Sequence, residues 1–405
     1  MNQPLRAPHA GPGDVLTPAV VEADRCLAEV SERLEFLLQV SPDNADEAWE
    51  EFEASGFQRT PRLDYRPLPY DPHLLKRALF SAPVESVEDP ALEQIFREKQ
   101  EELDIKITML RDRGTERFLL GSRMVFGGVA RELVELAEKL LFRLGSGSRS
   151  EPTEGSLDAA GFAALAAAEL DHYRGLDDGF TGRVEVRDDL LCGMMVNGDC
   201  LLVSSDLHVP RRRAEALVQH EVGVHLVTRF NGHTQPLELM ASGLAGYDAL
   251  QEGLAVTAEF LVDGLNPGRL RTLAGRVLVV DCLLEGAGFV EAFAVLHERY
   301  GFGPGAAFTI VTRVFRAGGF TKDAVYLRGL VELLGHLAAG GAVEPLMVGK
   351  IALVHLPLVE DLLARGVLHP PALVPRFLAG EANRERMAVL RRGLSPLDLV
   401  ATSHD

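Results

Sequence analysis

Apolar side chains recur every three to four residues over most of this chain, which predicts a mostly helical protein. The first helix is expected from Pro18 to Gln39, with Thr17 as its N-cap and Pro18 at its first position. Four prolines predict an extended connection from Thr60 to Pro72. The same spacing predicts further helices at Ala45 to Ala54, Pro90 to Leu110, Thr115 to Val125, Ala130 to Arg143, Leu157 to Arg174, Tyr247 to Val262, Arg269 to Glu285, Gly288 to Tyr300 and Pro304 to Phe315.

The period changes between residues 183 and 204, where apolar and polar residues alternate or form short apolar runs. Arg183 to Arg187 alternates and predicts one strand. Leu191 to Val196 and Cys200 to Ser204 flank Asn197-Gly198, and an Asn-Gly pair between apolar runs predicts a hairpin. This small sheet either offers an edge on which an extended peptide can bind, or only covers the core.

Composition limits the kind of protein. The sequence has 405 residues, 47% of them hydrophobic and 25% charged, which is typical of a globular protein. No apolar run is long enough to predict a membrane span, and no secretory signal is recognisable. Without any C-x-x-C spacing, reduced thiols in a cytoplasmic protein are expected for Cys26, Cys192, Cys200 and Cys282. The formal charge of −18 argues against a nucleic-acid partner.

The candidate chemistry lies in His220-Glu221-Val222-Gly223-Val224-His225, predicted to be helical. Neutral imidazoles suit Zn²⁺, and a glutamate next to the first histidine is where zinc peptidases hold their general base. The histidines are five residues apart, and an ideal helix would separate their directions by roughly 140°. A π-bulge absorbs one extra residue, and Gly223 would ease it, so we expect a bulged helix. Alternatively, the two histidines are simply packed in the core.

A third ligand is expected from the following helix, at Gln251-Glu252-Gly253-Leu254-Ala255. Glu252 and Glu259 share one face of that helix, and two carboxylates are costly to bury without a cation. This favours a metal site. Glu252 ranks first as ligand; Glu259 could replace it or orient a histidine through a hydrogen bond, and His233 ranks third.

These two motifs resemble those of the bacterial QEGLA-motif proteins, a family named for modulating flavohemoglobin expression. That family is similar to the microtubule-associated tyrosine carboxypeptidases, zinc enzymes of animals that remove a C-terminal tyrosine from α-tubulin. The resemblance extends to Val186–Leu190 and Gly318–Asp323 and covers about residues 65 to 390. It implies one Zn²⁺ per chain, held by His220, His225 and Glu252, with Glu221 as the general base. It does not transfer the substrate, because a charge of −18 disfavours an acidic tubulin tail.

The segment from Arg316 to Tyr326 is polar and glycine-rich between two apolar helices. It could grip a substrate carboxylate, with Lys322, Arg316 and Gly319 as substrate contacts. Tyr326, or alternatively His233, could stabilise the oxyanion. The other interpretation is an ordinary helix connection, with Arg316 capping the preceding helix and Lys322-Asp323 solvated.

These observations predict an α+β fold that is mostly helical and zincin-like, with a small mixed sheet beside the active-site helix. Residues 1–16 are expected to be a disordered arm, 17–150 a helical region and 151–405 the catalytic region. The tract from Gly145 to Ser150 either separates the two regions or is a surface loop, in which case residues 65–150 belong to one domain with the catalytic region.

The expected function is a zinc metallocarboxypeptidase that acts on a peptide or protein C-terminus, with preference for a C-terminal aromatic residue and without a nucleic-acid or membrane partner. The rival is a non-catalytic protein that uses the metal or the fold to bind a peptide or regulate expression. The sequence leaves open the physiological substrate, the oligomeric state and whether another divalent metal replaces zinc.

Overall fold

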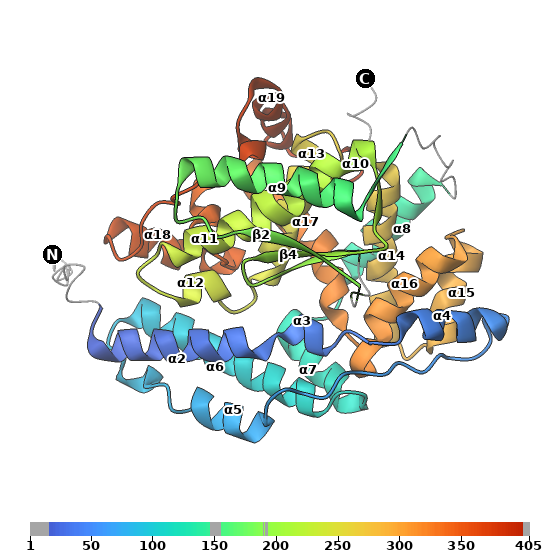
Figure 1. Cartoon of the computed structure of the whole chain (residues 1–405), viewed down its shortest axis with the longest axis horizontal. Coiled ribbons are helices and arrows are strands. Elements are labelled where there is room, and N and C mark those ends of the chain that lie inside the picture. The colour runs from blue at the N-terminus through green and yellow to red at the C-terminus, as the bar shows by residue number, and fades with distance from the viewer. Residues whose placement is uncertain (1–15, 146–154, 189, 191–192, 400–405) are drawn as a thin grey trace, which may run out of the picture.

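Helices make up most of the computed structural model, which describes residues 16–145, 155–188, 190 and 193–399 (Figure 1). The N-terminal helices are α2 (Pro18–Leu34), α3 (Phe36–Gln39), α4 (Ala45–Ala54), α5 (Pro72–Leu79), α6 (Pro90–Arg111), α7 (Glu116–Phe126) and α8 (Arg131–Leu144). The central ones are α9 (Ala159–Leu176), α10 (Arg211–Val218), the π-helix η2 (Gln219–Leu226), α11 (Val227–His233), α12 (Leu239–Ser242), α13 (Asp248–Leu261) and α14 (Pro267–Leu284). The C-terminal ones are α15 (Phe289–Ala294), the π-helix η3 (Val295–Arg299), α16 (Pro304–Phe315), α17 (Val325–Ala338), α18 (Leu356–Ala364) and α19 (Glu381–Leu390). Short 3₁₀ turns are η1 (Val84–Ser86), η4 (Arg316–Gly318), η5 (Thr321–Ala324), η6 (Glu344–Met347), η7 (Leu353–His355) and η8 (Arg376–Leu378).

The first helix begins as predicted but ends early. The Thr17 side chain accepts a hydrogen bond from the Val20 amide, and Pro18 occupies the first helical position. The prediction of one helix as far as Gln39 is wrong, because Glu35 adopts a left-handed conformation with φ of 41° between α2 and α3. Such a φ is uncommon for a residue with a Cβ, and no glycine or proline marks the break in the sequence.

Within the described part of the chain, five short strands form two small sheets. In the larger sheet, β4 (Cys200–Ser204) pairs with β2 (Arg183–Arg187) in parallel and with β3 (Met194–Asn197) in an antiparallel hairpin. The predicted hairpin at Asn197-Gly198 is therefore confirmed, and Gly198 supplies the positive φ of its turn. Residues 191 and 192 of the predicted strand, Cys192 among them, lie outside the described part. The smaller sheet pairs β1 (Ser156–Asp158) with β5 (His208–Pro210), and the sequence pattern did not predict it.

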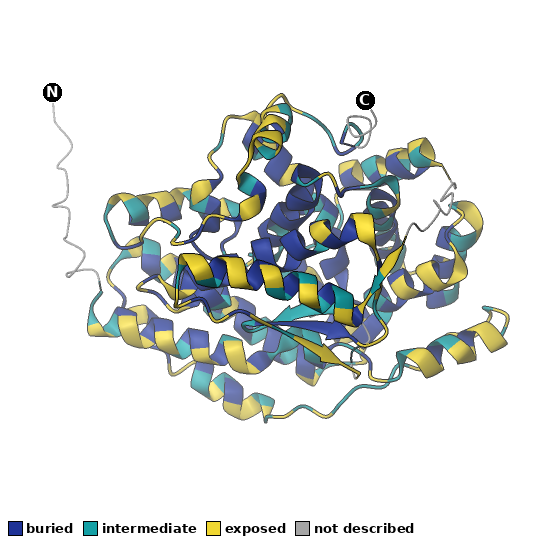
Figure 2. Cartoon of the chain, turned by 45° about the horizontal axis from the view of Figure 1, so that its top comes forward, coloured by how far each residue is buried: buried dark blue, intermediate teal, exposed yellow. Residues whose placement is uncertain are grey.

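The predicted α+β class is confirmed. Figure 1 shows α2, α5, α6 and α7 along one side of the molecule and α9 across the sheet of β2 and β4. Most surface helices present one buried and one exposed face (Figure 2). The main hydrophobic cluster contains residues from Val20 to Leu399, and a second cluster, which includes Phe162, Leu201 and Val227, lies under the larger sheet. Residues 1–15 of the predicted arm and residues 146–150 of the predicted linker lie outside the described chain.

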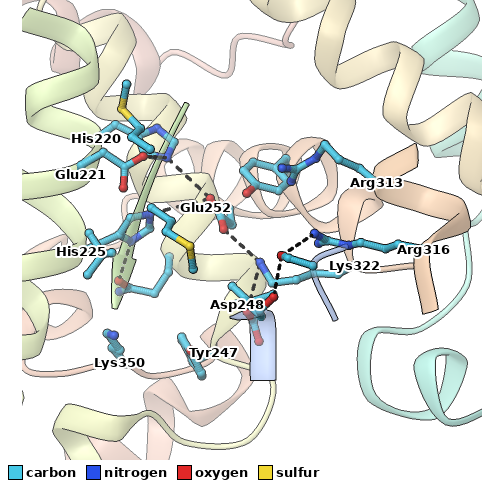
Figure 3. Close-up of a pocket in the computed structure, with 17 residues that line it drawn as sticks. His220, Glu221, His225, Tyr247, Asp248, Glu252, Arg313, Arg316, Lys322 and Lys350 are labelled. Carbon is cyan, nitrogen blue, oxygen red and sulfur yellow. Dashed lines mark hydrogen bonds and ion pairs between the residues drawn. The ribbon is translucent and has the colours of Figure 1, made fainter. Parts of the chain in front are cut away.

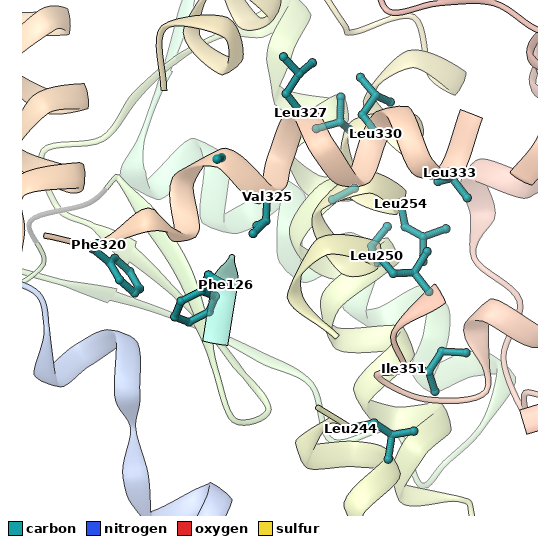
Figure 4. Close-up of a cluster of buried hydrophobic side chains, with 14 of the residues drawn as sticks. Phe126, Leu244, Leu250, Leu254, Phe320, Val325, Leu327, Leu330, Leu333 and Ile351 are labelled. Carbon is teal, nitrogen blue, oxygen red and sulfur yellow. The ribbon is translucent and has the colours of Figure 1, made fainter. Parts of the chain in front are cut away.

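Helices α13 and α17 cross at very short distance and fix the position of one carboxylate. A Cβ added at Gly253 would lie 2.4 Å from the backbone oxygen of Gly329, and one added at Gly329 would lie 1.8 Å from that of Ala249. Leucines of both helices pack around the crossing, as Figure 4 shows for Leu250 and Leu330. Since Glu252 precedes Gly253 on α13, this contact between α13 and α17 positions its side chain.

Over the described residues, no helix combines the length and apolar composition that spanning a membrane requires.

Candidate metal centre

The predicted bulge is present between the two histidines. α10, η2 and α11 follow one another without a break, and the π-turns of η2 contain both His220 and His225. A π-turn bonds residues i and i+5, so side chains five residues apart point to the same side. The two imidazole centroids are 5.1 Å apart. Gly223 allows the tight packing here, because a Cβ on it would lie 2.6 Å from Gln219 Oε1.

Glu252 from α13 completes a group of three possible ligands. One nitrogen each of His220 and His225 and one oxygen of Glu252 lie within 4.8 Å of one another. Glu252 Oε2 is 3.7 Å from His220 Nε2 and 3.8 Å from His225 Nε2. Ligand atoms that lie about 2.1 Å from a tetrahedral zinc ion are roughly 3.4 Å from one another. The three side chains would therefore have to move only slightly closer together to bind the ion.

The same oxygen carries an independent indication of a cation. Glu252 Oε2 is buried, and the described residues offer it no hydrogen-bond donor. An ionised oxygen buried without a donor is costly unless a cation compensates it. The three residues therefore fit a divalent metal ion.

Figure 3 shows the imidazoles of His220 and His225 turned towards Glu252, and a hydrogen bond behind each ring orients it. His220 Nδ1 lies 2.9 Å from Glu259 Oε1, and His225 Nδ1 lies 3.4 Å from Gln251 Oε1. With Nδ1 donating, Nε2 of each ring is left to accept a metal ion. Glu259 therefore lies where it can orient His220, which was one of the two roles considered for it from the sequence. Arg213 and Arg269 form ion pairs with its carboxylate at 2.7 and 3.1 Å.

Lys322 holds the other oxygen of Glu252. Its Nζ lies 3.1 Å from Glu252 Oε1 and 3.2 Å from Asp248 Oδ1, and its side chain is buried. Burial would raise the pKa of Glu252, but Lys322 and the two histidines outweigh it and lower that pKa to about 2. For His225 burial acts in the opposite direction: it disfavours the charged imidazolium and lowers the pKa of His225 to about 4. Both groups are thereby kept in the forms that bind metal ions.

Glu221 lies beside this group and is protonated more easily than an ordinary glutamate. Its Oε1 is 3.8 Å from His220 Nε2, and its side chain lines the same pocket. Burial raises the pKa of Glu221 above its usual value, and the nearby Glu252 carboxylate raises it further. A carboxylate with a raised pKa can accept a proton and later return it.

The pocket in front of the triad has a volume of about 160 Å³. The edge strand β3 contributes Met194, Met195 and Val196 to its wall. Leu37 and Ser41, from the α3 region, close it from another side. The charged and aromatic groups that line the rest of it are Tyr247, Asp248, Arg313, Arg316, Lys322, Tyr326 and Lys350.

A family model described as microtubule-associated tyrosine carboxypeptidase matches residues 50–394. The chain belongs to the microtubule-associated tyrosine carboxypeptidase family. The match includes the triad, Glu221 and every pocket residue named above except Leu37 and Ser41. A search of the curated proteins finds no match to the chain. The similarity to this carboxypeptidase family that the sequence motifs indicated is therefore confirmed.

In this tyrosine carboxypeptidase family member, the predicted substrate contacts do not all lie at the pocket. Arg316, Lys322 and Tyr326 line it, and the Tyr326 ring lies 5.4 Å from Lys322 Nζ. Gly319 does not line it: this residue is buried, and a Cβ on it would lie 3.2 Å from Leu119 and Leu283 side chains. Its φ of 119° gives it a backbone role.

Two alternatives from the sequence remain: His233 as the donor to the oxyanion, and an ordinary helix connection with Lys322 and Asp323 solvated. His233 is half exposed, 3.6 Å from Asp199, and does not line the pocket. Lys322 and Asp323 are not solvated as an ordinary helix connection would have them, because both are buried. Asp323 instead receives two bonds from Arg313, at 2.6 and 2.9 Å.

Three residues of the site escaped the sequence interpretation. Gln251 stood inside the motif but was given no role. Asp248 lies four residues before Glu252, a spacing that places both on one helix face and could have been noticed. Lys350 lies outside any helix, between η6 and η7, and no periodicity or motif signals it.

Proposed function

We propose that this protein is a zinc-dependent metallocarboxypeptidase that removes the last residue of a peptide or protein. The observation that carries the proposal is the convergence of His220, His225 and Glu252 around a buried carboxylate oxygen to which no described residue donates. Membership of a carboxypeptidase family supports the reaction type. The order of a small sheet followed by a His-Glu helix, which is that of zincins, also supports it.

His220, His225 and Glu252 would hold the ion, with Lys322 and Glu259 fixing the ligands. A bound Zn²⁺ would supply Lewis-acid activation of water and of the scissile carbonyl. Glu221 accepts the proton of the attacking water and gives it to the leaving amine. Tyr326 lines the same pocket and is our candidate donor to the oxyanion. The substrate backbone would lie along the free edge of β3.

A preference for a C-terminal aromatic residue is supported by a second cavity of about 400 Å³ beside the metal pocket. The two share Ser41, Arg313 and Arg316 in their walls. Trp49 and Phe308 line the second cavity, with ring centroids 5.1 Å apart. Such a space would accept a planar side chain.

The described cysteines are free, and we propose that the protein acts in the cytoplasm on peptide C-termini.

One peptide prepared with free, amidated and N-acetylated ends tests the proposal. The expected result is removal of the last residue from the free and acetylated forms and no reaction with the amidated form. Glu221→Gln should retain zinc and lower turnover by about 10²- to 10⁴-fold. Internal cleavage of the amidated peptide would indicate an endopeptidase, and inhibition by N-acetylation an aminopeptidase. Zinc binding without any hydrolysis would leave a non-catalytic binding protein.

A further inference from the structure

Among the residues that the structure describes, four cationic side chains line the metal pocket, and three of them already contact other groups of the chain. Lys322 contacts both Glu252 and Asp248. Arg313 is bound by Asp323. Arg316 lies over the Phe320 ring at 4.8 Å, and its Nη1 is 3.5 Å from Ser41 Oγ. Arg313 and Arg316 also interact with further groups of the chain.

Lys350 is the exception. The described residues place no carboxylate within ion-pair distance of its Nζ and no acceptor within hydrogen-bond distance, and the centre of the Tyr247 ring is 5.7 Å away. Burial lowers the pKa of Lys350 to about 8, so the group is mainly charged at neutral pH. Lys350 is only partly exposed to solvent, so its charge is incompletely hydrated, and an anionic ligand would stabilise it.

The backbone around Lys350 is fixed, so its side chain enters the pocket from a defined position. Its amide donates to Met240 O at 2.8 Å, and its carbonyl accepts from Leu244 N at 2.9 Å. Figure 3 shows the side chain beside Tyr247, on the His225 side of the pocket and away from Arg313 and Arg316. A ligand held by Lys350 would therefore lie next to the metal site.

Gln251 provides a second, independent sign of a ligand on this side. Its side chain is 2% exposed and lines the same pocket. Its Oε1 accepts from His225 Nδ1, which leaves Nε2 as a donor. Nε2 is buried, and the described residues give it no acceptor. An unsatisfied buried donor costs about 1–3 kcal/mol, so an acceptor atom brought by a ligand would be favoured here.

We propose that Lys350, assisted by the Gln251 amide, binds the C-terminal carboxylate of the substrate. The inference rests on the proposed function and assigns to Lys350 the role that the sequence gave to Lys322. A charge-assisted hydrogen bond from Lys350 stabilises the carboxylate, and its fixed position near Tyr247, on the His225 side of the pocket, favours the last peptide bond at the metal site. Lys350 is thus a specificity-determining residue.

The experiment measures kcat/KM for one peptide with a free and with an amidated C-terminus. Lys350→Met should lower the value for the free acid by about 10- to 100-fold, mainly through KM, without lowering any residual rate on the amide. Lys350→Arg should restore part of the loss. Lys139→Met, the same change at an exposed position of α8, should have no effect. Full retention of the preference for the free acid in Lys350→Met would overturn the inference.

Calorimetric binding separates this inference from the proposed function. In the Glu221→Gln protein, Lys350→Met should weaken binding of the free-acid peptide at least about 10-fold with zinc content unchanged. If the wild type cleaves peptides and binding does not depend on Lys350, the carboxylate site is wrong and the function stands. If the wild type cleaves nothing but binding depends on Lys350 and on a free C-terminus, the site stands and the function fails. Absence of both cleavage and binding overturns both.

Discussion

At the scale of the residue, Glu252 is the group on which the site depends most. One of its oxygens faces the two histidines, and the other is held by Lys322. Its alanine variant would lose a ligand and leave the Lys322 ammonium with Asp248 alone.

We predict that Glu252→Ala contains far less zinc than the wild type, which should hold about one ion per chain. Elemental analysis of purified protein measures this, with circular dichroism to verify folding. Glu47→Ala, at an exposed position of α4, is the matched control and should retain the ion. Unchanged zinc in a folded Glu252→Ala protein would contradict the proposed ligand set.

Residue-level chemistry was predictable where local spacing carries it. The five-residue separation of His220 and His225 already required a π-turn if both were to bind one ion, and η2 provides it. The roles of Lys322 and Lys350 were not predictable, because each depends on which distant side chains fold against it. Lys322 contacts residues 74 and 70 positions earlier, and no local pattern encodes that distance.

At the scale of the element, the crossing of α13 and α17 connects stability to the site. Gly253→Ala would force apart two backbones, since its Cβ would lie 2.4 Å from Gly329 O. We predict a loss of about 1–3 kcal/mol in the free energy of unfolding, together with reduced zinc affinity because α13 carries Glu252. Chemical denaturation and a zinc titration measure the two effects.

Gly335→Ala on α17 is the control for this prediction. A Cβ there meets nothing within 4 Å, so the variant should be more stable by about 0.4–1 kcal/mol. If Gly253→Ala were equally harmless, the close helix crossing would not exist in solution.

A second prediction at this scale concerns Asp24, which joins α2 to the start of α12. Its carboxylate accepts the amides of Glu238 and Leu239 at 2.6 and 3.0 Å. Burial is the main cause that raises the pKa of Asp24 to about 6. Because the folded-state pKa lies above the unfolded value, the associated stability is present below about pH 4 and is lost as pH rises through 6.

Denaturation of the wild type and Asp24→Asn between pH 4 and 7 measures this loss. The wild type should lose about 2 kcal/mol relative to the variant over that range. A stability difference independent of pH would show that the carboxyl group titrates normally.

Some helix boundaries could be predicted from the sequence, and others could not. The bounds of α4 and α16 equal those predicted, because caps, prolines and regular apolar spacing are local signals. The break at Glu35 has no glycine or proline to signal it, and the β1–β5 pair depends on contact between distant parts of the chain. For β1 and β5, the paired strands are about 50 residues apart and three residues long, too short for a periodic signal.

At the scale of the whole molecule, residues of both predicted regions contribute to one hydrophobic cluster. We propose on this basis that residues 17–145 and 155–399 form a single folding unit. The cavity beside the metal pocket lies between α4 and α16, and so joins early and late parts of the chain.

Trp49 makes this arrangement testable, because it is the only tryptophan of the sequence and lines that cavity. In the Glu221→Gln protein, a peptide ending in phenylalanine should change Trp49 emission saturably, since the aromatic side chain enters beside the indole. A peptide ending in glycine serves as the control and should leave the emission nearly unchanged. Tight calorimetric binding of the phenylalanine peptide without any spectral change would exclude this cavity as its site.

Leu37 and Ser41 line the pocket but precede residue 50, where the family match begins. The groups proposed for bond cleavage all lie within the matched part. Substitutions around α3 would therefore reshape one wall of the pocket while the proposed ligands and base remain untouched. Exchange of this short segment between relatives would consequently change which peptides fit the pocket, while the residues proposed for bond cleavage stay the same.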